Sequence, residues 1–103
     1  MKTKTQIYMD YQMAISQADA CVALADKLNN EAVYSWEECL REAARGWTGE
    51  SAAAFTSHSR MVQEKLRGSA AELKKTGEAI RSIAGNTLRS ELRALELAKL
   101  RNY

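Results

Sequence analysis

The residues of this chain that could support catalysis are few, and their spacing argues against it. His58, the single histidine, stands between Ser57 and Ser59, and a histidine that activates a serine is the basis of many hydrolases. On a helix, however, neighbouring side chains point about 100° apart, so these three cannot form a charge-relay arrangement. A short helical chain also offers no enclosed cleft for a nucleophile and its base. We therefore expect no enzymatic activity and no catalytic residues.

Metal binding and disulfide bonding are disfavoured in the same way. Cys21 and Cys39 have no partner at the short spacings typical of metal sites. A cluster of three glutamates forms one acidic helix face, but no second set of ligands accompanies it. On one continuous helix the two cysteines would lie about 27 Å apart, too far for a bond between them. We expect no metal and no cofactor, and we interpret both cysteines as small core residues, with a solvent-facing thiol as the alternative. The three glutamates are Glu37, Glu38 and Glu42.

Two long helical patterns surround a short bend in this chain of 103 residues, which contains no proline. We predict an all-α fold, an antiparallel two-helix hairpin that forms a single domain over residues 1–103. Gly85 and Asn86 resemble a helix stop followed by a new helix start, and they set the tail apart. The predicted elements are a first helix over about 5–45, a bend over 46–50, a second helix over about 51–84 and a helical or flexible tail over 86–103.

The bend has a physical logic of its own. Gly46 can adopt the left-handed backbone that ends a helix, and Thr48 can cap the helix that follows. Gly49 adds no side chain where two helices must come close. Trp47 is expected to fold back over the closed end of the hairpin and to pack against Phe55.

The first helix carries apolar residues on two opposite sides. One stripe follows alternating steps of four and three, is interrupted by Asn29, and consists of Ile7, Tyr11, Ile15, Ala18, Val22, Ala25, Ala32 and Trp36. The second stripe lies about 200° around the helix and consists of Met9, Met13, Ala20 and Leu24. Two helices can cover only one face of each other, so we expect the second stripe to bind a partner.

The second helix repeats the four-three spacing of an antiparallel coiled coil, which can associate with a second hairpin in a four-helix bundle. The predicted contact line consists of Phe55, Ser59, Val62, Leu66, Ser69, Leu73, Thr76, Ile80 and Ile83. Gly68 and Gly77 each cost about 1 kcal/mol relative to alanine inside a helix. They therefore either weaken this helix or serve a close contact.

These features resemble the WXG family, the small helical hairpins secreted by the type VII systems of mycobacteria and other Gram-positive bacteria. Trp47-Thr48-Gly49 lies in the middle of the chain, and a run of small residues leads to Phe55. The motif covers residues 46–55 and the architecture covers the whole chain. The resemblance implies a non-enzymatic export substrate, or a targeting partner and chaperone for a larger toxin with a helical N-terminal domain. It implies pairing with itself or a related hairpin, and recognition by a secretion motor ATPase.

The family also places an export signal in the tail. The mycobacterial signal is a tyrosine followed four residues later by an acidic residue, and residues 86–103 contain no such pair. Relatives from low-GC bacteria use hydrophobic positions around an acidic residue. Leu92, Glu96 and Tyr103 fit part of that pattern, but Lys99 stands where an apolar residue is expected. This departure favours a secretion partner that is recognised jointly with a second protein.

Charge and hydropathy bear on nucleic-acid binding, membrane insertion and export. With 15 basic and 13 acidic residues, the net charge of +2 is too small for a nucleic-acid-binding surface. We find no membrane-spanning run and no signal-peptide pattern, so we expect cytoplasmic synthesis and export without a signal peptide. Two alternatives stay open. One is a cytosolic structural or adaptor coiled coil unrelated to secretion, and the other, ranked lower, is a membrane-active amphipathic protein.

Overall fold

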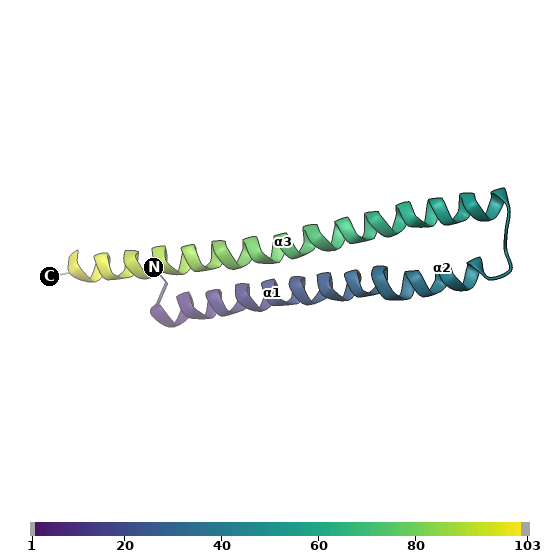
Figure 1. Ribbon diagram of the computed structural model, residues 1–103. Helices are drawn as coiled ribbons and strands as arrows, with labels where there is room; N and C mark the ends of the chain where they lie inside the picture. The colour runs from purple at the N-terminus through teal and green to yellow at the C-terminus, as the bar shows by residue number, and fades with distance from the viewer. Residues whose placement is uncertain (1, 102–103) are drawn as a thin grey trace. The chain divides into compact units, whose positions relative to one another are not determined.

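The computed structural model describes residues 2–101, and all of their regular structure is helical. The helix α1 spans Lys4–Asn30, a π-helical turn spans Glu31–Ser35, α2 spans Trp36–Ala44 and α3 spans Glu50–Arg101 (Figure 1). No strand occurs between residues 2 and 101. The all-α prediction is therefore confirmed. None of the described helices combines the length and the apolar character needed to cross a bilayer.

The chain divides into two compact units. Unit 1 combines Met1–Val22 with Lys75–Tyr103, and unit 2 consists of Ala23–Lys74. Each unit therefore contains one part of α1 and one part of α3, and each is described by itself below.

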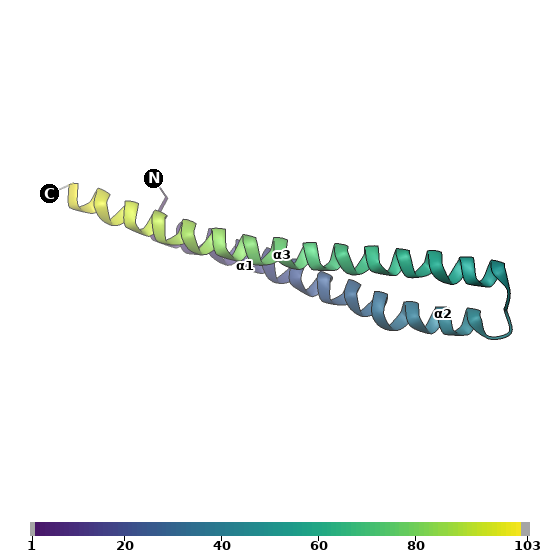
Figure 2. The same ribbon diagram turned by 45° about the horizontal axis from the view of Figure 1, so that its top comes forward.

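The two helical segments of unit 1 are antiparallel. Asp19 of α1 pairs with Arg81 of α3, whereas Lys2, at the other end of the α1 segment, pairs with Glu91. The sequence number thus rises along one segment as it falls along the other. Figures 1 and 2 show these segments side by side near the labelled ends of the chain.

A narrow line of small side chains holds the segments of unit 1 together. Its buried apolar residues are Ile7, Ala18 and Ala84. Gly77 is buried among them, and a Cβ atom added there would lie 2.8 Å from Val22 Cγ2 and 3.0 Å from the carbonyl oxygen of Ala18. Gly77 therefore serves a close helix contact.

Unit 2 is also an antiparallel pair, in which α2 and the end of α1 face the first half of α3. Trp36 contacts Ser59, while Ala32, earlier in the chain, contacts Gln63. The buried apolar residues of unit 2 are Ala25, Ala32, Leu40 and Ala70. Gly68 lies in this unit with open space around its Cα, so it only weakens the helix.

The contact line of α3 agrees with the prediction at five of its nine positions. Ser59 is buried, and Val62, Leu66, Leu73 and Ile80 are half-buried. Four other predicted members are exposed, namely Phe55, Ser69, Thr76 and Ile83. Buried residues instead lie one position later: Gln63 follows Val62, Ala70 follows Ser69, Gly77 follows Thr76 and Ala84 follows Ile83. The prediction was wrong at Ile83 because close approach of the helices in unit 1 favours the small Ala84 over a large apolar side chain. Gln63 is buried because of its hydrogen bonds, which are described below.

The predicted break at Gly85 is absent, because α3 continues through it to Arg101. Gly85 does not have a positive φ. The Asn86 side chain accepts a hydrogen bond from Arg89 one turn later, so it stabilises the helix instead of capping a new one. Leu88 and Glu91 then extend the half-buried face of the helix along unit 1. The tail is thus an ordered part of α3 as far as residue 101.

The start of α1 is fixed by a reciprocal cap that the sequence analysis overlooked. The backbone N–H of Gln6 donates to Thr3 Oγ1 at 3.2 Å, and the N–H of Thr3 donates to Gln6 Oε1 at 2.9 Å. This arrangement is a capping box, in which each side chain satisfies a free donor of the other residue. It defines where the first turn of unit 1 begins.

Candidate functional site

The bend in unit 2 brings together two of the predicted motif residues. The rings of Trp47 and Phe55 lie 5.2 Å apart at an angle of 44°, which is a favourable distance for an aromatic pair. The predicted contact is therefore confirmed. The two side chains are 43% and 41% exposed, so the pair lies on the surface and does not form a buried plug.

Two glycines shape the backbone of this bend. Gly46 has a φ of +77° and Gly49 a φ of +101°, both in the region that other residues rarely adopt. The expectation for Gly46 is confirmed. Gly49 was expected to make room for a neighbouring helix, but a Cβ there would meet nothing within 4 Å. Its role is conformational.

The start of α3 differs in one further detail from the prediction. Gly49 directly precedes the helix, and its carbonyl oxygen accepts the N–H of Ala53 at 3.0 Å. The cap position is thus occupied by Gly49, one residue after the predicted Thr48. A hollow beside the rings is lined by small side chains, including Ala43, Ala52 and Thr56. The bend therefore presents two exposed rings on a backbone fixed by glycine.

A polar network lies in unit 2 around Gln63, a residue that the predicted contact line did not include. Gln63 is 2% exposed, and its Nε2 donates to the carbonyl oxygen of Ala32 at 2.8 Å and to Glu37 Oε1 at 3.1 Å. Arg60 also pairs with Glu37 and donates to Gln63 Oε1 at 3.2 Å. The Arg60 guanidinium, and secondly the Gln63 amide, lower the pKa of the Glu37 carboxyl.

This network meets the π-helical turn of Glu31–Ser35, which separates α1 from α2. The N–H of Trp36 donates to the carbonyl of Glu31, five residues earlier, and Trp36 Nε1 donates to the carbonyl of Ser59 at 3.0 Å. Such turns insert one extra residue into a helix. The predicted continuous first helix is therefore helical throughout 4–44 but has a change of register in the middle.

A signal for this turn exists in the sequence. Ala32, Trp36 and Leu40 are separated by two consecutive steps of four, which on a regular α-helix would carry the apolar line about 80° around the axis. The extra residue of the π turn compensates for that drift and allows Leu40 to be buried. As a result, the neighbouring Cys39 is exposed, whereas Cys21 is half-buried, and both thiols are free. The prediction of a core position was wrong for Cys39.

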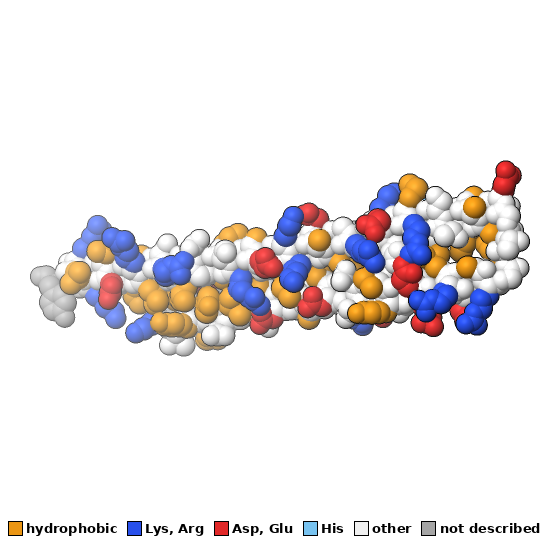
Figure 3. Space-filling model, viewed as in Figure 1, with side chains coloured by type: hydrophobic (Ala, Val, Ile, Leu, Met, Phe, Trp, Pro, Cys, Tyr) orange, Lys and Arg blue, Asp and Glu red, His pale blue; other side chains and the backbone are white. Residues whose placement is uncertain are grey.

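All four residues of the predicted partner stripe are exposed. Met9 and Met13 in unit 1 are 62% and 61% exposed, Ala20 is exposed as well, and Leu24 in unit 2 is 57% exposed. Figure 3 shows hydrophobic side chains gathered over the start of α1 and the adjacent part of α3. The side chains of the stripe are therefore not buried by other residues of their own unit. The partner that the sequence analysis assigned to them stays a prediction.

Two of the three predicted tail residues belong to the described part of unit 1. Leu92 and Glu96 line a hollow that Lys4 and Tyr8 of α1 complete. Tyr8 and Lys4 also line the adjoining hollow beside Met9. Tyr103 lies outside the described residues. Leu92 and Glu96 therefore lie on the same surface of unit 1 as Met9 of the stripe, which the sequence alone did not suggest.

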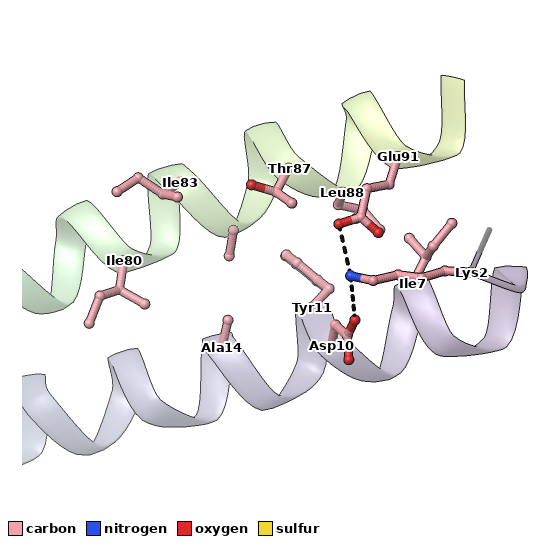
Figure 4. Close-up of a pocket in the computed structure, with 11 residues that line it drawn as sticks. Lys2, Ile7, Asp10, Tyr11, Ala14, Ile80, Ile83, Thr87, Leu88 and Glu91 are labelled. Atoms are coloured by element: carbon pink, nitrogen blue, oxygen red, sulfur yellow. Dashed lines mark hydrogen bonds and ion pairs between the residues drawn. The ribbon is translucent and has the colours of Figure 1, made fainter. Parts of the chain in front are cut away.

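A second groove in unit 1 is closed by Lys2. Its Nζ lies 2.7 Å from Asp10 Oδ2 and 3.2 Å from Glu91 Oε1, so the side chain bridges the two segments (Figure 4). Both carboxylates, Asp10 first, raise the pKa of the Lys2 amine. The apolar lining of the groove includes Ile7 and Tyr11. Lys2 therefore acts as a polar strap over an apolar contact.

Among residues 2–101, the candidate residues are distributed over both units. Unit 2 contains Leu24, Trp47, Gly49 and Phe55, and unit 1 contains Met9, Met13, Ala20, Leu92 and Glu96. Within the same range, no three metal-ligating side chains lie close enough to hold an ion. No protein-family model, curated protein or solved structure matches this chain.

Proposed function

We propose that this chain is a non-enzymatic partner in type VII secretion, either a WXG-type substrate or a targeting partner and chaperone for a larger toxin. The observation that carries the proposal is the exposed Trp47–Phe55 pair on a bend fixed by two glycines. A large aromatic pair that is more than 40% exposed contributes little to its own core. Such a pair is well suited to bind another protein, because exposed aromatic side chains are typical anchors of interfaces.

In this proposal the chain acts as an antiparallel two-helix hairpin, which pairs with itself or a related hairpin in a four-helix bundle. The uncovered stripe of Met9, Met13, Ala20 and Leu24 supplies the pairing face, and its exposure supports that role. A secretion motor ATPase reads the Trp47-Gly49 bend together with a C-terminal tail. Pairing takes place in the cytoplasm, before export without a signal peptide.

The test is export of a Trp47→Ala variant from a bacterium that carries the secretion system. We expect export to be lost while the helix content in circular dichroism is kept, because the Trp47 side chain is not part of the buried core. Tyr34→Ala is the matched control, since Tyr34 is an aromatic of the same unit and is 70% exposed. Export of the Trp47 variant at the wild-type level would remove the bend from the recognition mechanism.

A cytosolic adaptor coiled coil is the second candidate. Lys99 favours it, because a charged residue occupies a tail position where the export pattern needs an apolar one. The wild-type protein decides between the two functions. Retention of the wild-type chain inside cells that export other substrates supports the adaptor.

A further inference from the structure

The hollow between the start of α1 and the last turns of α3 combines an apolar floor with a basic rim. Tyr8, Leu92 and Leu95 form the floor, and Lys4, Arg93 and Lys99 form the rim. Tyr8 is 42% exposed, and the hollow adjoins the surface of Met9, which is still more exposed. We refer to these six residues as the basic hollow.

The charges of the basic hollow are not balanced within unit 1. Lys2 and Arg81 have carboxylate partners, but among residues 2–101 no ion pair forms with any of the three rim cations. Glu96 is the one carboxylate that lines the hollow, and Arg89 adds a fourth cation. The surface is therefore strongly positive although the whole chain is almost neutral.

Helix dipoles explain only part of this pattern. Lys99 lies in the last turn of α3, where a cation is stabilised by the negative helix end. Arg93 lies two turns earlier, and the dipole effect is confined to the last turn. Lys4 occupies the positive end of α1, whose first turn contains no acidic residue. Lys4 and Arg93 are thus placed where an external anion would stabilise them.

We propose that the basic hollow binds an acidic amphipathic helix of a different protein, with leucine-like residues on the floor and Asp or Glu against the rim. This proposal rests on the proposed function, since the hollow adjoins Met9 of the proposed pairing face, and it names the class of partner that binds there. The apolar floor supplies the burial that an amphipathic helix needs. Opposite charge at the edges sets the partner and accelerates encounter.

A second copy of this chain fits the basic hollow poorly. In a symmetric dimer built on this hollow, both subunits would contribute the same positive patch to the interface, so the rim cations of the two copies would be brought close together. The acidic run of the chain lies on α2, and the apolar Leu40 of that helix is already buried at 7% exposure. α2 therefore has no free apolar face to place on the floor. The hollow selects a heteromeric partner.

The test measures binding of two labelled synthetic helices to the full-length protein by fluorescence anisotropy. Both peptides have three heptads with leucine at the a and d positions, and they carry either glutamate or lysine at e and g. We expect the glutamate peptide to bind about tenfold more tightly than the lysine peptide. The difference should shrink between about 0.1 M and about 1 M salt, as the Debye length falls from about 10 Å to about 3 Å.

Two charge-reversed variants with the same change in net charge locate the site. Arg93→Glu combined with Lys99→Glu should reverse the preference between the peptides. Lys27→Glu combined with Lys65→Glu should keep it, because these exposed lysines lie in unit 2. Circular dichroism of both variants confirms that the helices are intact.

The proposal is overturned if the wild type binds neither peptide, binds both equally, or keeps its preference after the rim is reversed. Binding to vesicles with anionic lipid but not to the glutamate peptide would assign the hollow to a membrane surface instead. The outcome is separable from the export test. If Trp47→Ala loses export but the wild type binds no peptide, only the proposal of the basic hollow is wrong. If the wild type binds the peptide but is never exported, only the secretion role is wrong.

Discussion

Units 1 and 2 are both antiparallel helix pairs, but they are held together in different ways. Unit 2 places a hydrogen-bonded glutamine on the line of contact, where Gln63 joins the π turn to Glu37. Unit 1 places Gly77 at the equivalent position of the repeat, two heptads further along α3, and brings the backbones close. Polar groups thus define the pairing in unit 2, whereas steric fit defines it in unit 1.

The difference has a functional consequence. Small side chains such as Ala18 and Ala84 bury little apolar area, so the larger apolar groups of unit 1 are left outside. Met9, Met13 and Ile83 are each about 60% exposed. Unit 1 therefore has an apolar surface that its own contact line does not bury, in addition to the exposed Trp47–Phe55 pair of unit 2.

The largest effect is expected from Gly77→Ala. The new Cβ would lie 2.8 Å from Val22 Cγ2, on a side chain that is stiff at χ1, and 3.0 Å from the carbonyl oxygen of Ala18. We expect a loss of about 2 kcal/mol in the free energy of unfolding, because overpacking outweighs the higher helix propensity of alanine. Urea denaturation followed by circular dichroism measures it.

Gly68→Ala is the matched control in the same helix. Its Cβ would meet no atom within 4 Å, so only helix propensity acts and the protein should gain about 1 kcal/mol. Opposite signs for the two substitutions are the diagnostic result. A gain in stability at both positions would mean that the helices of unit 1 do not pack at this distance.

The next largest effect is expected from Gln63→Leu in unit 2. It removes the side-chain donor to the Ala32 carbonyl and to Glu37, and a buried group that loses its partner costs about 1–3 kcal/mol. The π turn loses its support and should revert to a regular α-helix. That change of register turns Cys39 toward α3, so its alkylation by a maleimide should become slower.

Cys21 provides the internal reference for this experiment, because it lies in unit 1 and in the same molecule. Mass spectrometry after timed labelling measures both thiols at once. We expect the ratio of Cys39 to Cys21 labelling to fall in Gln63→Leu. An unchanged ratio together with reduced stability would show that the π turn does not depend on Gln63.

The sequence predicted the helical class and the bend because both depend on local signals. Glycine at positions 46 and 49 and the aromatic pair are readable from residue type and short spacing. The π turn was missed although two consecutive steps of four from Ala32 to Leu40 indicate it, because the side chain that contacts it, Gln63, lies 31 residues further along the chain. The position of Ile83 was missed for a related reason. A hydrophobic pattern predicts which residues are buried from their polarity. Where two backbones lie close together, the size of the side chain decides which residue is buried.

Acid should weaken unit 2 through Glu37. Arg60 and Gln63 lower the pKa of this carboxyl in the folded protein, so its contribution to stability is complete above the ordinary glutamate value of about 4.3. It is lost as the pH falls through the lowered pKa of the folded state. We expect the difference in Tm between the wild type and Glu37→Gln to vanish over this acid range.

Glu38→Gln is the control for Glu37, because Glu38 is the exposed neighbour on α2. Its Tm difference from the wild type should show no comparable step. If both variants followed the same curve, the contact between Glu37 and Arg60 would contribute nothing specific to the stability of unit 2.

The smallest effect is expected in unit 1, at the opposite end of the pH scale. Asp10 and then Glu91 raise the pKa of the Lys2 amine, so its contribution is complete below the ordinary lysine value of about 10.4 and is lost as the pH rises through the raised value. The Tm of the wild type minus that of Lys2→Gln should therefore fall toward zero only in alkali. Lys2 is half exposed, so this difference should be smaller than the one at Glu37. A larger effect at Lys2 would reverse the comparison, because the charged strap would then contribute more to unit 1 than the Arg60 pair contributes to unit 2.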